Sequence, residues 1–246
     1  MQASDSLGGA VFFLVLQKRY FLLGVDFSGG VRIINVDSLN QYKTISFLKG
    51  ATVAKVYFYY SAMNAGKSTV LLQTDYNYRE RGMASLIYTP SIDDRYAPNQ
   101  VTSRIGLKAE AQAFDAGFDF YQDVMAKSES RAGMKMCVLV DEAHFLKKCQ
   151  VEQLCLVADH LGIPVLCYGL RSDFLGEPFE GSQYLLVWAD KLVELKTVCH
   201  CGKKATMNMR IAADGQKVTE GSQIAIGGND LYISTCRQHF LMPAQK

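Results

Sequence analysis

A short apolar run in this chain leads directly into a glycine-containing loop that opens a helix. The run is VYFYY at 56–60, the loop is SAMNAGKST at 61–69, and the helical pattern continues to a stop at Gly82. A loop with this ending binds phosphate between a strand and a helix, because main-chain N–H groups and the helix N-terminus hold the phosphate oxygens. This stretch therefore predicts the strand–loop–helix unit of a nucleotide-binding α/β fold.

The loop supplies a continuous set of candidate contacts to ATP and Mg²⁺. Lys67 would bridge the outer phosphates, and Ser68 would place its hydroxyl on the metal. The general pattern has a glycine at the position of Ser61, whereas Gly66 is kept where the backbone must approach phosphate. A strand-to-helix turn without a ligand is the structural alternative. The candidate contacts are Ser61, Ala62, Met63, Asn64, Ala65, Gly66, Lys67 and Ser68.

A second apolar run, CVLVDEA at 137–143, ends in two carboxylates. Ligands bind beyond the carboxyl ends of the strands in parallel sheets, so Asp141 and Glu142 should lie at the same edge as the loop. Asp141 suits Mg²⁺, which leaves Glu142 to act as a general base. Favourable acidic residues at a helix N-terminus are the structural alternative.

The letters DEAH at 141–144 also mark a class of helicases. Such motors need two motor domains, with an arginine supplied across the cleft between them. About 190 residues remain from Val56 onward, which is room for one such domain. A single-domain helicase fragment therefore stays an alternative, and it would hydrolyse ATP when nucleic acid is added.

Strand and helix patterns alternate from Val56 to Leu170. This alternation is typical of a parallel sheet with helices on both faces, the α/β class. A loop should follow at 171–183, regular structure at 183–195, and a knuckle and hairpin at 198–218 with its turn at Asp214-Gly215. Short apolar runs before 52 could also be strands. The expected strands are 56–60, 84–89, 136–143 and 163–170, the expected helices are 67–82, 108–128 and 147–162, and a polar loop is expected at 89–104.

Composition limits the partners. The 26 Lys and Arg against 24 Asp and Glu leave a net charge of +2, which gives no basic footprint for nucleic acid. No run reaches the roughly 18 apolar residues of a membrane helix. A signal peptide requires a Lys or Arg before its apolar segment, and the apolar run at 8–16 is preceded by neither. We therefore expect a cytoplasmic protein that binds neither nucleic acid nor a membrane.

The cysteines fall into two groups. Four of the seven sit singly in apolar or helical patterns and are expected to be reduced thiols in the interior. The others lie near the C-terminus with histidines, and Cys-x-Cys and Cys-x-x-His are spacings of metal ligands in a reducing compartment. Four such ligands suit tetrahedral zinc and leave no open position, so the site should be structural. These candidate ligands are Cys199, Cys201, Cys236 and His239.

Several segments in fixed order resemble thymidine kinase, the cytoplasmic family with a zinc-bearing lasso domain, in its bacterial branch. The resemblance runs from about residue 55 to 240. It implies transfer of the ATP γ-phosphate to the 5′-hydroxyl of thymidine, and division into an N-terminal extension (1–52), a P-loop kinase domain (53–196) and a zinc-binding lasso domain (197–246). The segments are YFYYSAMNAGKST, IDDRYAPNQVTSRIGL, VLVDEAHF, PVLCYGLRSDFLGEPFEGSQYLL, KLVELKTVCHCGKKATM and IGGNDLYISTCRQH.

The resemblance also implies roles for individual residues. Glu142 matches the base that accepts the 5′-hydroxyl proton. Arg95 matches the arginine that reaches the transferring phosphate, and Asp93 beside it would support Mg²⁺. Phe174 matches the aromatic residue that packs on thymine. The thymine edge and sugar would be read by the loop IAIGG with the aromatic residue after it, at Ile226, Gly227 and Tyr232.

Each of these roles has a structural alternative. Arg95 could form a surface ion pair, Phe174 could belong to the lasso core, and Tyr232 could pack in a hairpin. His144 stands where many relatives have glutamine, which should adjust the site and leave activity in place. Residues 1–52 have no counterpart that we can identify, so they represent either a genuine appendage or a misplaced start.

Relatives in this family are tetramers and are inhibited by thymidine triphosphate, so we expect a homotetramer with the same inhibition. A protein of another class remains as an alternative, namely a zinc-bearing regulatory module that binds ATP and phosphorylates nothing. Such a module needs neither a base at Glu142 nor an aromatic slot at Phe174.

Overall fold

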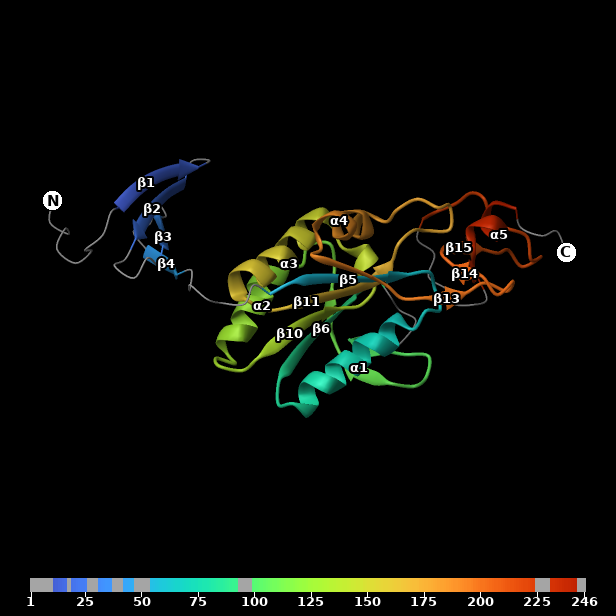
Figure 1. The fold of residues 1–246 in the computed structure, drawn as a ribbon, viewed down its shortest axis with the longest axis horizontal. Helices are drawn as coiled ribbons and strands as arrows, with labels where there is room; N and C mark the ends of the chain where they lie inside the picture. The colour runs from blue at the N-terminus through green and yellow to red at the C-terminus, as the bar shows by residue number, and fades with distance from the viewer. Residues whose placement is uncertain are drawn as a thin grey trace. The chain divides into compact units, whose positions relative to one another are not determined.

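The computed structural model describes residues 11–16, 19–25, 31–36, 42–46, 54–92, 99–223 and 231–242, and for the strands before residue 47 it describes the backbone alone. The chain forms two compact units, Met1–Thr52 and Val53–Lys246 (Figure 1). Each unit is considered by itself.

The N-terminal unit contains an antiparallel sheet whose strands follow each other in chain order. The strands are β1 (Val11–Leu16), β2 (Arg19–Val25), β3 (Val31–Val36) and β4 (Tyr42–Ser46). The apolar runs before residue 52 therefore form strands, as the sequence indicated, and YKTIS adds a fourth one.

The second unit is built on a parallel sheet of six strands in the order β12-β5-β11-β10-β6-β9. Its central strands are continuous apolar runs, which is the pattern expected where helices cover both faces of a sheet. β10 is buried along its whole length. The strands are β5 (Val56–Ser61), β6 (Ala84–Pro90), β9 (Gln112–Phe114), β10 (Met136–Val140), β11 (Val165–Leu170) and β12 (Lys191–Glu194).

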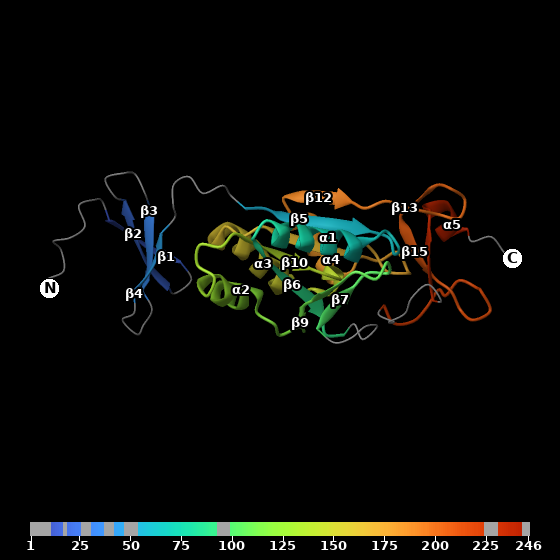
Figure 2. The same ribbon diagram turned by 90° about the horizontal axis from the view of Figure 1, so that it is seen from below.

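Helices cover both faces of this sheet, as Figure 2 shows. α1 (Lys67–Glu80) packs on one face through Leu71 and Leu72. α2 (Phe120–Glu129), α3 (Lys148–Leu161) and α4 (Glu180–Trp188) cover the other face, and they share a larger apolar core with the sheet. The predicted α/β fold with a parallel sheet is confirmed. α3 ends at Gly162, whose φ of 66° is in the left-handed region that favours glycine.

The segment 108–128 was predicted as one helix, and that prediction is wrong. The structure has two short strands there, β8 (Lys108–Glu110) and β9, before α2 begins at Phe120. Ala109 is buried between exposed neighbours, which is the two-residue period of a strand. β8 pairs with β7 (Gln100–Thr102) inside the predicted polar loop. Pairing between strands thus outweighs the helix propensity of the letters KAEA.

The C-terminal residues form two small sheets beside the parallel one. β13 (Thr197–Val198) pairs with β14 (Lys204–Ala205), and β15 (Met207–Arg210) pairs with β16 (Tyr232–Thr235). The predicted turn at Asp214-Gly215 exists, with Gly215 at a φ of 82°. The hairpin around it, however, is reduced to one bridge, because β15 takes its partner from a strand more than twenty residues away. Helix α5 (Arg237–Leu241) follows β16.

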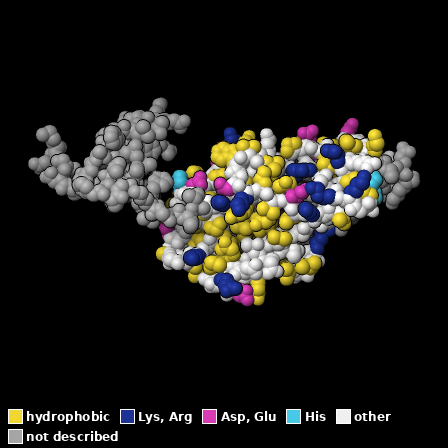
Figure 3. All heavy atoms as spheres, viewed as in Figure 1, with side chains coloured by type: hydrophobic (Ala, Val, Ile, Leu, Met, Phe, Trp, Pro, Cys, Tyr) yellow, Lys and Arg dark blue, Asp and Glu magenta, His cyan; other side chains and the backbone are white. Residues whose placement is uncertain are grey.

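Positive, negative and apolar side chains are mixed on the face of the molecule that Figure 3 shows.

Among the described residues, no helix combines the length and apolar character needed to cross a membrane.

Candidate active site

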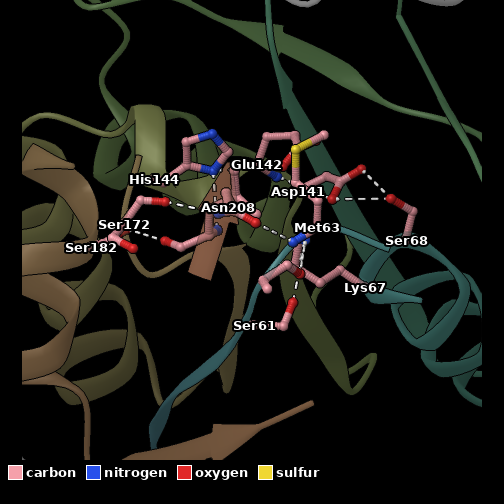
Figure 4. Close-up of polar contacts among 12 residues, drawn as sticks. Ser61, Met63, Lys67, Ser68, Asp141, Glu142, His144, Ser172, Ser182 and Asn208 are labelled. Carbon is pink, nitrogen blue, oxygen red and sulfur yellow. Dashed lines mark hydrogen bonds and ion pairs between the residues drawn. The ribbon is translucent and has the colours of Figure 1, made fainter. Parts of the chain in front are cut away.

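The glycine loop connects the carboxyl end of β5 to the start of α1. Gly66 caps the helix with a φ of 78°, a left-handed conformation that most side chains disfavour. The ammonium of Lys67 is buried and points back across the loop, where it donates to the Ser61 hydroxyl at 3.3 Å and to the Ala62 carbonyl at 3.5 Å (Figure 4). Ser61, which replaces the usual glycine, therefore holds the lysine side chain across the loop.

The carboxylates after β10 lie beside this loop. Figure 4 shows the Ser68 hydroxyl donating to Asp141, at 3.1 Å to Oδ2. Burial raises the pKa of Asp141 well above its usual range, and the nearby Glu142 carboxylate raises it further. Lys67 and the Ser68 hydroxyl act in the opposite direction, but with smaller effect. A cation beside Asp141 and Ser68 would therefore remove an electrostatic cost that the folded chain carries.

Glu142 has an unusual backbone conformation. Its φ of 44° and ψ of 42° are left-handed, which is uncommon for a residue other than glycine and often marks a functional site. Its main-chain N–H donates to Asp141 Oδ1 at 3.0 Å. The following turn, Ala143–Phe145, packs under α4, where a Cβ on Gly181 would approach the Ala143 carbonyl oxygen to 2.4 Å. Close packing of α4 thus fixes the turn that carries Glu142.

One cavity of about 420 Å³ joins the loop, the carboxylates and an aromatic cluster. The cluster is formed by Met63, Phe174 and Tyr232, which pack against each other. The remaining sequence candidates in the cavity wall come from the glycine loop and the end of β10. Those wall residues are Asn64, Gly66, Lys67, Ser68, Asp141 and Glu142. The structure therefore brings together residues from four separate stretches of the chain. The predicted site residues Asp93, Arg95, Ile226 and Gly227 lie outside the described residues.

Two residues on β15 were missed by the sequence reasoning: Asn208, which lines the cavity, and Arg210, which contacts two residues of its aromatic cluster. The Arg210 guanidinium lies 3.8 Å from the centre of the Phe174 ring, and its Nη2 donates to the Tyr232 hydroxyl at 2.7 Å. Asn208 lies two residues before Arg210 on the same strand, so both side chains leave one face of β15. Polar residues alternating with methionines in MNMR were the available signal. The signal could be used only once β15 was known to be a strand beside the cavity.

The predicted metal ligands converge on a point. The ligand atoms of Cys199, Cys201, Cys236 and His239 lie within 4.8 Å of each other. Two sulfurs are 3.9 Å apart, and His239 Nδ1 is 3.4 Å and 3.5 Å from the sulfurs of Cys199 and Cys236. A tetrahedral zinc ion requires about 3.8 Å between sulfurs and about 3.6 Å between sulfur and nitrogen. The four side chains therefore fit zinc.

The neighbouring groups also suit a thiolate site. Burial raises the pKa of the Cys199 thiol, but hydrogen bonds from the main chain of Cys201 and Cys236 outweigh it and lower the pKa to about 6. His200 is outside the set of four, and its ring stacks 4.2 Å from that of His239.

Sequence comparisons identify the family of the chain. The family model for thymidine kinase matches residues 54–240. A thymidine kinase of Vibrio vulnificus is 61% identical over 188 residues, which are 76% of this chain and 97% of that protein. Those of Legionella pneumophila and Coxiella burnetii are 58% and 55% identical over the same share of this chain, and 90% and 95% of their own lengths are covered.

A comparison with solved structures gives a DnaB-like replicative helicase, with a TM-score of 0.31 and 13% identity over 50% of this chain and 41% of that one. A likeness at this score carries no argument about function. The family model and the high identities both extend over most of the chain, and together they establish its family. This chain is a kinase that belongs to the thymidine kinase family.

Proposed function

We propose that this protein transfers the γ-phosphate of ATP to the 5′-hydroxyl of thymidine and forms dTMP for nucleotide salvage. The supporting observation is the shared cavity, in which a glycine loop, two carboxylates and an aromatic cluster meet. A phosphate donor and a flat base need these two kinds of surface within reach of each other. The relatives' names supply the choice of thymidine as the acceptor.

The phosphate end would be organised by the glycine loop. Main-chain N–H groups of the glycine loop would surround the phosphates, except that of Met63, which donates to Asn208. The Lys67 ammonium would move from the Ser61 hydroxyl to the outer phosphate oxygens. Ser68 and Asp141 would hold Mg²⁺. The bound metal would neutralise charge that develops on the transferring phosphate.

Glu142 would accept the proton of the 5′-hydroxyl. A carboxylate is a weak base for an alcohol, so positioning contributes more than basicity and the proton leaves late in the reaction. The backbone of Glu142, fixed by Asp141 and by the turn under α4, serves that positioning. The resemblance assigns Arg95 to the transferring phosphate and Asp93 to support of Mg²⁺.

Thymidine would occupy the cavity beside the aromatic cluster. Phe174 would stack on the base, and Tyr232 with the backbone of Ile226 and Gly227 would read its edge and sugar. Backbone hydrogen bonds suit this reading, because a mismatched base leaves them without partners.

The remaining proposals concern the whole protein. Zinc would tie the lasso residues 197–246 together, because this small region cannot bury a core of its own. Residues 53–196 would form the kinase domain and 1–52 an extension. We also propose a cytoplasmic homotetramer, inhibited by thymidine triphosphate.

The decisive experiment incubates the full chain with γ-labelled ATP, Mg²⁺ and a panel of nucleosides. Label should appear on thymidine, and Lys67→Ala should lower kcat/KM for ATP strongly because the outer phosphates lose their counter-charge. Addition of DNA or RNA should leave ATP consumption unchanged. Label transfer to no nucleoside would favour the regulatory module, and stimulation by nucleic acid would favour the helicase fragment.

A further inference from the structure

Asn208 uses both ends of its side-chain amide inside the protein. It lies on β15 with 2% of its surface exposed. Its Oδ1 accepts from the Met63 main-chain N–H at 2.7 Å, and its Nδ2 donates to the Ser172 carbonyl at 2.9 Å. Figure 4 shows this side chain between the two segments. One buried amide therefore joins the glycine loop to the loop after β11.

Met63 in the glycine loop is held from the lasso side at both of its main-chain polar groups. Asn208 accepts from its N–H, and the buried Ser234 hydroxyl on β16 donates to its carbonyl at 2.6 Å. The two strands that contact Met63 are paired with each other, Asn208 directly opposite Ser234. The conformation of the glycine loop at this point thus depends on the β15–β16 pair.

The Nδ2 end of the Asn208 amide contacts the loop that carries Phe174. Ser172 stands two residues before Phe174 in a loop braced by Asp173, whose Oδ1 accepts from the main-chain N–H groups of Leu175 and Glu177. Phe174 in turn belongs to the same apolar cluster as Met63. A shift of this loop would therefore reach Met63 through the Asn208 amide and through the apolar cluster.

We propose that Asn208 is a positioning residue that couples the two halves of the site, so that thymidine and MgATP each strengthen the binding of the other. The proposal rests on the proposed function. Thymidine that orders the Ser172–Phe174 loop fixes Asn208, and Asn208 fixes the Met63 N–H in the glycine loop. Because coupling between binding sites is reciprocal, MgATP must change thymidine affinity by the same factor.

The two contacts of Asn208, with Met63 and with Ser172, require a carboxamide side chain. One end must accept from an N–H and the other must donate to a carbonyl, both in a buried place where an unpaired group is costly. Aspartate offers no donor for Ser172, and leucine offers neither group. The side chain of asparagine meets both needs at this length.

The test measures the Kd of a non-hydrolysable ATP analogue with Mg²⁺ on the zinc-loaded full chain, without and with saturating thymidine. For the parent, thymidine should tighten analogue binding at least about fivefold, the lower end of ordinary coupling between sites. Asn208→Ala should reduce that factor to less than about twofold. The reverse titration of thymidine, with and without analogue, should return the same factors. A general loss of stability would weaken the binding of both ligands, but thymidine would still tighten analogue binding by the same factor.

Two further variants keep the test decisive. Ser234→Ala removes only the contact to the Met63 carbonyl, so it should also lower the ratio, and it decides the matter if Asn208→Ala does not fold. Lys204→Ala is the matched control, because it breaks a contact between β14 and Glu194 of β12, at 2.7 Å, that does not touch the cavity. Its ratio should equal that of the parent.

The outcomes separate the two proposals. A parent that phosphorylates thymidine but shows no coupling, or an Asn208→Ala protein that keeps the parent's ratio, overturns the role of Asn208 and leaves the proposed function standing. A parent that neither binds nor phosphorylates thymidine removes both.

Discussion

The Nδ1 atom of His144 lies 3.5 Å from the Oε2 atom of Glu142, and both side chains are largely buried, with 3% and 13% of their surfaces exposed. The same Nδ1 accepts from the main-chain N–H of Leu170 at 3.3 Å. The histidine therefore accepts from the Leu170 backbone, as the amide oxygen of a glutamine at this position would.

The first prediction tests Glu142 as the base. Glu142→Gln should keep the affinities for thymidine and ATP and lower kcat by about 10²- to 10⁴-fold, because the amide cannot take the proton. Steady-state kinetics and direct binding measurements check this. His144→Gln is the matched control and should stay active, since its amide oxygen can accept the Leu170 N–H. Turnover of Glu142→Gln within threefold of the parent would remove Glu142 from the mechanism.

The second prediction concerns pH. Burial, then the charge of Glu142, raises the pKa of Asp141 to about 7. Protons therefore compete with Mg²⁺ as the pH falls through 7, and the apparent Mg²⁺ affinity of the nucleotide complex should drop about tenfold between pH 8 and pH 6. Magnesium titrations at the two pH values measure it. Asp141→Asn should bind Mg²⁺ weakly at both, and an equally strong pH dependence in that variant would assign the effect to another group.

The raised pKa of Asp141 also affects the stability of the folded chain. An acid with a raised pKa holds its proton more tightly in the folded chain than in the unfolded one. In the absence of Mg²⁺, the contribution of Asp141 to the free energy of unfolding therefore falls as the pH rises from about 4 to about 7.

The third prediction tests whether Phe174 contacts the thymine ring and leaves ATP binding unaffected. Phe174→Ala should raise KM for thymidine roughly 5- to 150-fold, the range for loss of an aromatic stack on a base, and change KM for ATP little. The Arg210 guanidinium would also lose its contact with this ring and keep its hydrogen bonds to the Tyr232 hydroxyl. Phe240→Ala removes another buried aromatic side chain, outside the cavity, and should lower stability alone. Equal effects of Phe174→Ala on both substrates would indicate general damage.

The fourth prediction links metal and fold. Cys201→Ser should lower the zinc content and the Tm together, because a ligand of a structural site is lost. Metal analysis and thermal unfolding on the same samples check it. Cys149 is also exposed but lies on α3, so Cys149→Ser should change neither quantity. A parent protein that is stable and active without zinc would disprove the metal proposal.

The fifth prediction addresses the first residues. The family match begins at residue 54, and the matched residues cover 97% of the Vibrio vulnificus kinase. A protein starting near Val53 should therefore fold, bind zinc and phosphorylate thymidine as fast as the full chain. Insoluble or inactive protein, under conditions where the full chain works, would make residues 1–52 an integral part of the kinase.

The sequence by itself determined the elements that rest on local patterns. The β5–loop–α1 unit could be predicted because a buried apolar run, Gly66 and a helical period follow each other without interruption. β10, β11 and α3 were recognised for the same reason. The metal ligands could be named because two short cysteine and histidine motifs carry their spacing within a few residues.

Tertiary structure decided what depends on distant partners. β7 and β8 became strands because they pair with each other, although the letters around Ala109 favour a helix. β15 pairs with β16 and leaves the expected hairpin as a single bridge. Asn208 reaches Met63 across 145 positions of sequence, and Arg210 meets Phe174 only because β15 packs against the loop that follows β11. Such contacts follow from burial and pairing across the whole unit, which no local pattern in the chain records.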